Sequence, residues 1–127
     1  MTNRGFSHIG LSTLDLDKTR DFYENDTHFF VHAMADPDLP LDAQSPAILL
    51  WAPFRDPPPH VCGKVMICGH TPQDTGDPRN LGHAICIDTH AHGTGWLTCL
   101  DTRSGQLWQS TEAGELREGA IDTYRTA

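Results

Sequence analysis

The sequence has little positive charge, no long apolar run and no close pair of cysteines. Nine Lys and Arg residues stand against 17 Asp and Glu residues, which gives a net charge of −8. This surplus of negative charge argues against a nucleic-acid backbone or an anionic membrane as the main partner. No segment approaches the roughly 20 apolar residues of a membrane-spanning helix, and the first residues lack the apolar core of a signal peptide. We therefore expect a cytoplasmic protein that uses neither partner.

The absence of a Cys-x-x-Cys pair also bears on metal binding and redox state. The four cysteines are Cys62, Cys68, Cys86 and Cys99, and three of them fall inside predicted strands. This placement favours buried, reduced thiols over a zinc knuckle or disulfides.

The chain is long enough for one domain with a real core. It has 127 residues, of which 38% are apolar and 20% charged, an ordinary balance for a globular protein. We expect a single domain over residues 1–127.

The apolar run over residues 65–68 predicts a buried strand, and the residues after it point to a site. Gly69 permits a turn after the strand, His70 follows it, and a Thr-Pro pair prevents the strand from continuing. A second predicted strand, over residues 27–33, carries His32 near its carboxyl end. Because ligands tend to bind beyond the carboxyl ends of strands, the two imidazoles are candidates for one shared metal ion.

The remaining elements follow from shorter patterns. Apolar spacing predicts a helix over residues 43–51, and three prolines at 57–59 force an extended segment before His60. Residues 73–81 are predicted as a polar loop, 83–88 as a strand, and 96–101 with 106–110 as a hairpin around Gly105. His90 and His92 fall in a glycine-flanked turn, which favours exposed imidazoles over a chelate. The polar end, 120–127, is expected to fray.

The first 25 residues have a different character. Residues 6–12 alternate as a strand, and 18–24 are predicted to continue a helix. This βα unit resembles the start of vicinal oxygen chelate proteins, the glyoxalase and bleomycin-resistance superfamily. The resemblance implies a metal ligand at His8, but the motifs that would complete such a site do not follow.

The later blocks resemble another family. They comprise residues 26–33 (Asp-Thr-His-Phe-Phe-Val-His-Ala), 36–41 (Asp-Pro-Asp-Leu-Pro-Leu), 69–73 (Gly-His-Thr-Pro-Gln), 80–89 and 95–101. Together, from about residue 22 to 119, they are similar to the C-terminal portion of calcineurin-like metallophosphoesterases, in the serine/threonine phosphatase and diadenosine tetraphosphatase branch. The resemblance implies that His32 and His70 bind a divalent ion (Mn, Fe or Zn) and that the substrate is a phosphorylated protein or a nucleotide.

The same family takes its other ligands from Gly-Asp-x-His-Gly, Gly-Asp-x-x-Asp-Arg-Gly and Gly-Asn-His-Glu blocks, and none of the three occurs here. Catalytic residues therefore stay unassigned. We interpret the chain as a composite, with a glyoxalase-like unit over 1–25 and a truncated metallophosphoesterase-like core over 26–119. The alternatives are a vicinal oxygen chelate protein that uses His8, and a non-catalytic interaction domain. Exposed strand edges would also favour homo-oligomers.

The order of elements defines the expected fold. Strand, helix, strand, helix and then several strands predict an α/β protein, with α+β as the alternative. We expect a mixed β-sandwich with flanking helices, in which the late strands are antiparallel.

Overall fold

The computed structural model describes residues 22–126. His8, the predicted strand over 6–12 and most of the predicted N-terminal helix lie outside the described residues. Residues 22–24, predicted as the end of that helix, form strand β1 (Phe22–Glu24) instead. Tyr23 is the register partner of Phe30 on the neighbouring strand. The helical prediction is wrong at these residues because aromatic side chains favour a strand when a partner strand is at hand.

The first sheet has five strands in the order β1-β2-β3-β5-β4. Its members after β1 are β2 (His28–Val31), β3 (Val65–Cys68), β4 (Arg79–Asn80) and β5 (Ala84–Cys86). Strands β2, β3 and β5 are parallel neighbours, whereas β1 and β4 run antiparallel at the two edges. The three parallel strands therefore end at the same edge of the sheet.

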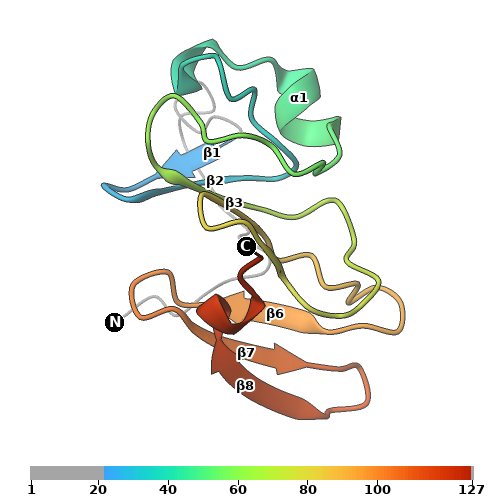
Figure 1. Ribbon diagram of the computed structural model, residues 1–127. Helices are drawn as coiled ribbons and strands as arrows, with labels where there is room; N and C mark the ends of the chain where they lie inside the picture. The colour runs from blue at the N-terminus through green and yellow to red at the C-terminus, as the bar shows by residue number, and fades with distance from the viewer. Residues whose placement is uncertain (1–21, 127) are drawn as a thin grey trace, which may run out of the picture.

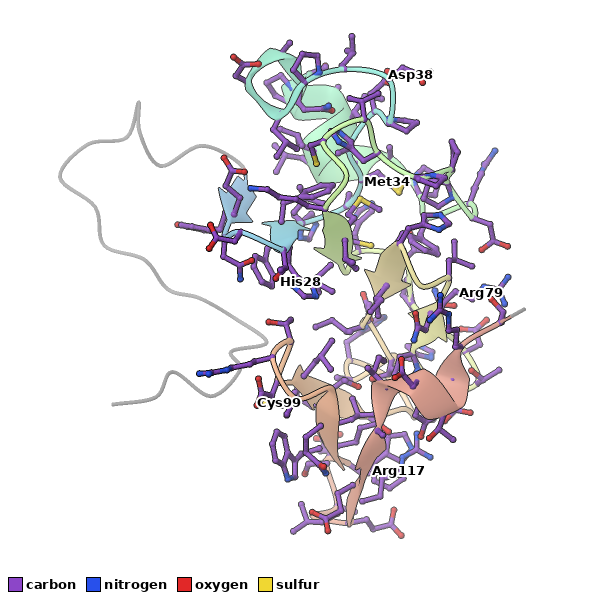
Figure 2. The ribbon with its side chains drawn as sticks, turned by 60° about the vertical axis from the view of Figure 1, so that its left-hand side comes forward. His28, Met34, Asp38, Arg79, Cys99 and Arg117 are labelled. Atoms are coloured by element: carbon purple, nitrogen blue, oxygen red, sulfur yellow. The ribbon has the colours of Figure 1, made fainter. Side chains whose placement is uncertain are left out.

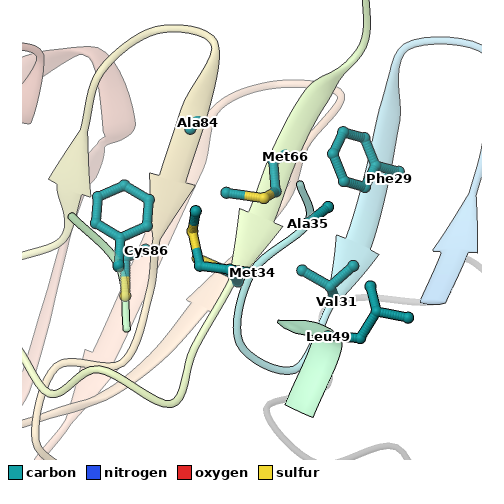
Figure 3. Close-up of a cluster of buried hydrophobic side chains, with 10 residues drawn as sticks. Phe29, Val31, Met34, Ala35, Leu49, Met66, Ala84 and Cys86 are labelled. Carbon is teal, nitrogen blue, oxygen red and sulfur yellow. The ribbon is translucent and has the colours of Figure 1, made fainter. Parts of the chain in front are cut away.

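Alternate side chains of β3 and β5 cover opposite faces of this sheet. Met66 and Ala84 join a buried cluster with Phe29 of β2 and Leu49 of helix α1 (Pro46–Trp51), which covers this face (Figure 3). The predicted helix begins later than expected, at Pro46, because proline suits the first helical position. A short 3-10 helix, η1 (Leu41–Ala43), precedes it.

The opposite face packs on a second sheet. Ile67 and Ile85 contact Leu100 of β6 (Leu97–Leu100) and Ile121 of the 3-10 helix η2 (Ile121–Tyr124). Strands β6, β7 (Gln106–Ser110) and β8 (Leu116–Ala120) form this antiparallel sheet, which lies below the first one in Figure 1. The protein is thus a mixed α/β-type sandwich with little helix and antiparallel late strands, as the sequence predicts.

The described part of the end that is expected to fray, residues 120–126, is held in place. Ala120 ends β8 along β7, and Ile121 is buried in η2. The backbone N–H of Thr126 donates to the carbonyl of Asn80 at 2.9 Å. Asn80 belongs to β4, a strand within the segment that was predicted as a loop. The predictions of a loop at 73–81 and of a frayed end are wrong for the same reason. Both rest on the local polarity of the sequence, which does not show backbone pairing with a distant segment.

All four cysteines are free in the structure. Cys68 and Cys86 are buried at paired positions of β3 and β5, as expected, whereas Cys62 is exposed and Cys99 half-buried. Across residues 22–126, no helix combines the length and the apolar character needed to cross a membrane.

His60 gives the fold an expected pH dependence. Its ring packs 5.0 Å from that of Phe29, and its Nδ1 accepts the backbone N–H of Cys62 at 3.1 Å. Burial lowers the pKa of His60 below its ordinary 6.5, so the native state disfavours the protonated ring. The unfolded chain then binds more protons, and stability falls as the pH drops through 6.5 toward the lower native value. His28, whose pKa burial also lowers, adds to this loss.

We expect the urea midpoint to decrease between about pH 7.5 and about pH 5.5. His60→Gln should be less stable at neutral pH but should show a smaller decrease over the same interval. An unchanged slope in His60→Gln would show that this ring does not contribute to the pH dependence.

Candidate functional site

Two histidines meet at the edge of the first sheet where the parallel strands end. His32 directly follows β2, and His70 lies two residues after β3. Nε2 of His32 is 3.1 Å from Nδ1 of His70, and the ring centroids are 4.9 Å apart. The structure therefore brings together the two imidazoles that the sequence singles out, from positions 38 residues apart along the chain.

The backbone around His70 has an uncommon conformation. His70 has φ 64°, in the left-handed region that non-glycine residues rarely adopt. Thr71 donates its backbone N–H to the carbonyl of Gly69 at 2.7 Å, which closes a three-residue turn around the imidazole. Gly69 in turn donates to the carbonyl of His32 at 2.9 Å. Strained positions of this kind persist where the surrounding structure holds them, and they concentrate at functional sites.

Several neighbours hold this turn. The Thr71 hydroxyl accepts the backbone N–H of Phe54 at 2.8 Å, and the Cys86 thiol donates to the Thr71 carbonyl at 3.4 Å. A hydrogen bond from the Cys68 thiol lowers the pKa of Cys86 and raises the pKa of Cys68 well above its ordinary value. The turn is therefore supported by two strands and by the segment after α1.

The paired imidazoles suit a metal ion. Two nitrogens that each bind one ion at about 2.0–2.1 Å lie about 2.9–3.4 Å apart, depending on the angle at the ion. The observed 3.1 Å falls in this interval. In the metal-free protein the same separation permits an N–H···N hydrogen bond, with one ring as donor and the other as acceptor.

The site is open to solvent on the side of α1. His32 is exposed and His70 half-buried. The ring of Trp51, the last residue of α1, stands edge-on to His70 with centroids 6.0 Å apart, and Trp51 is 71% exposed. The sequence predicts Trp51 as part of a helix but not as a neighbour of His70. Helical spacing shows which face of the helix a residue occupies, and it does not show which distant residue packs against that face.

The other histidines occupy different places. His90, with φ 66°, and His92 form a second ring pair, with centroids 4.7 Å apart, on the turn after Thr89. Nδ1 of His90 is 3.6 Å from the carboxylate of Asp74. His83 donates its Nε2–H to the carbonyl of Pro57 at 2.7 Å.

Over residues 22–126, no three His, Cys, Asp or Glu side chains gather in a way that could hold a metal ion. The paired rings of His32 and His70 are therefore two potential ligands of an ion whose further ligands would come from outside this group.

Comparisons of the chain with family models, with curated proteins and with solved structures found no match. The two family resemblances of the sequence therefore stay predictions.

Proposed function

We propose that His32 and His70 bind one divalent metal ion, Mn, Fe or Zn, in a truncated metallophosphoesterase-like domain. The observation that carries the proposal is the 3.1 Å separation of His32 Nε2 and His70 Nδ1 beyond the ends of two adjacent parallel strands. Imidazole suits Zn and Fe, whereas Mn prefers oxygen ligands and would take more of them from water or substrate. The backbone strain at His70 supports the same proposal. Residues in such conformations cluster at functional sites, and here the conformation places the imidazole beside His32.

The substrate class in this proposal is a phosphate ester, on a protein or a nucleotide. A divalent ion supplies a Lewis acid for a phosphoryl oxygen. The two histidines hold and orient the ion, and the exposed Trp51 ring beside His70 offers an apolar surface to the rest of the substrate. Two protein ligands leave most coordination positions to water, to the substrate or to a second chain. Phosphoesterase activity of the isolated chain is accordingly expected to be weak.

The proposed compartment is the cytoplasm. Its support is the state of the cysteines, which are all free although Cys68 and Cys86 are neighbours on adjacent strands. Thiols persist in reduced form in that compartment.

The direct test is metal affinity. Titration of the chelator-treated protein with Mn²⁺ or Zn²⁺, by calorimetry and by tryptophan fluorescence, should show binding in the wild type. Loss of a supporting residue around a metal commonly costs 10–100-fold in affinity, so loss of a direct ligand in His32→Ala or His70→Ala should cost about 100-fold or more. A fluorescence change that disappears in Trp51→Phe would place the ion beside His70. Hydrolysis of p-nitrophenyl phosphate should follow metal binding.

His92→Ala is the matched control, because it removes an imidazole of the other ring pair. If His92→Ala or His8→Ala abolishes binding while the His32 and His70 variants retain it, the assignment of the site is wrong. Absence of any metal binding in the wild type would instead favour a non-catalytic interaction domain.

A further inference from the structure

A cavity of about 290 Å³ opens at the edge of the first sheet opposite to His70. It lies where β3 and β5 begin, since its lining includes Lys64 and Val65 at the start of β3 and Gly82 and His83 before β5. His70 follows the other end of β3, about 20 Å away for six residues of extended chain. The cavity is thus separate from the paired histidines.

The charged side chains of this cavity are all cationic. Lys64 and Arg125 line it, and the described residues contribute no carboxylate to its wall. The whole protein carries a net charge of −8, so two cations at one concave place are a local exception. Such a place attracts anions.

Arg125 is held over the cavity by the C-terminal segment. The buried Asn80 donates its side-chain N–H to the carbonyl of Ile121 at 3.0 Å, and its backbone carbonyl accepts the N–H of Thr126. The guanidinium then lies directly against Gly82, where an added Cβ would come within 2.7 Å of Nη2. Within residues 22–126, no carboxylate forms an ion pair with Arg125.

Lys64 already pairs with one carboxylate. Its ammonium lies 2.5 Å from the Glu24 carboxylate, and the Lys64 side chain is 25% and the Glu24 side chain 48% exposed. Ion pairs that solvent reaches contribute little free energy, so a dianion in the cavity can compete with Glu24 for Lys64. Val65 and Leu81 add an apolar portion to the wall.

We propose that this cavity binds a small phosphate monoester, with the dianionic phosphate between Lys64 and Arg125 and the organic group against Val65 and Leu81. Arginine and lysine both recognise phosphate through charge-assisted hydrogen bonds. A cavity of about 290 Å³ lies at the small end of ligand sites, which suits a compact ester. The site requires no metal ion and does not depend on the function proposed for the paired histidines.

The test is a calorimetric titration with phenyl phosphate, inorganic phosphate and benzoate, in the presence of a chelator. The host is the full chain with His32→Ala and His70→Ala, which removes the other proposed site. We expect phenyl phosphate to bind more tightly than inorganic phosphate, and benzoate to bind least.

Variants locate the site. Arg125→Gln should weaken binding of phenyl phosphate about tenfold, the effect of one charged hydrogen-bonding partner. Arg103→Gln, at the exposed turn between β6 and β7, is the matched control and should change nothing. Glu24→Gln should tighten binding about two- to fivefold, because it frees Lys64. This gain cannot arise from misfolding.

Three results would overturn the proposal. The first is no binding of phenyl phosphate by the host protein at millimolar concentration. The second is an equal affinity for benzoate, which would remove phosphate as the recognised group. The third is unchanged affinity in both Arg125→Gln and Glu24→Gln, which would place the anion elsewhere.

Discussion

Phe29→Ala should lower the free energy of unfolding by about 3–5 kcal/mol, the range for loss of a fully buried aromatic side chain. Phe29 is 0% exposed. It lies in the cluster that joins β2 and β3 to α1 (Figure 3). Its ring also packs against that of His60. Removal of the ring leaves a cavity among elements that are held by different parts of the chain. The surrounding structure can therefore fill that cavity only in part.

Urea unfolding, followed by circular dichroism, measures the loss. Trp51→Ala is the control, since it removes a larger side chain that is 71% exposed and should change stability by no more than about 0.5 kcal/mol. If the two variants lost similar free energy, the cluster around Phe29 would not be the core of this domain.

Arg117→Met should lower the free energy of unfolding by about 2–3 kcal/mol, mainly through loss of charged hydrogen bonds. Arg117 lies on β8, in the second sheet (Figure 2). Its guanidinium donates to the carbonyl of Gly76 at 2.7 Å, to Asp77 at 2.8 Å and to Gln109 Oε1 at 2.6 Å. It also lies 4.3 Å from the ring centroid of Trp96. These contacts connect the last strand to the loop before β4.

The expected loss of stability in Arg117→Met is large because the substitution leaves a buried hydrogen-bond acceptor without its donor. Gln109 is 3% exposed, so its Oε1 would lose its partner in a place that water reaches poorly. Methionine keeps most of the aliphatic stem over Trp96, so the change reports on the guanidinium.

Two further variants divide the contributions of Arg117. Asp77→Asn, which removes only a partly exposed ion pair, should cost less than about 1 kcal/mol. Arg103→Met should cost less than about 0.5 kcal/mol. A loss in Arg117→Met no greater than that in Asp77→Asn would show that the bonds to Gly76 and Gln109 contribute nothing.

Local patterns account for much of the first sheet and for the hairpin. The apolar run at 65–68 is β3, and its alternate residues Met66 and Ile67 cover opposite faces of the sheet. The hairpin turn has Gly105 at φ 75°, a conformation that glycine adopts at little cost. In both places a short stretch of sequence is enough to predict the local structure, because the strand pattern and the turn glycine both lie within that stretch.

Long-range pairing explains the places where the sequence misled. Residues 22–24 carry a helical pattern but form β1 against β2, and residues 79–80, within the predicted loop, form β4 against β5. Neither strand is strongly apolar, so each depends on a partner that is already in place. A single sequence does not reveal which distant segment supplies that partner.

The two candidate sites divide in the same way. The sequence by itself placed His32 near the carboxyl end of one strand and His70 just after another, because apolar runs and the glycine after β3 are local features. Only the tertiary structure decided that β2 and β3 are parallel neighbours, which brings the two rings within 3.1 Å. It alone also placed Lys64, from the middle of the chain, and Arg125, near its end, on the wall of one cavity. The reason is physical: a run of apolar residues bounded by turn residues is a local feature of the sequence, whereas the choice of neighbouring strand depends on the packing of the whole chain.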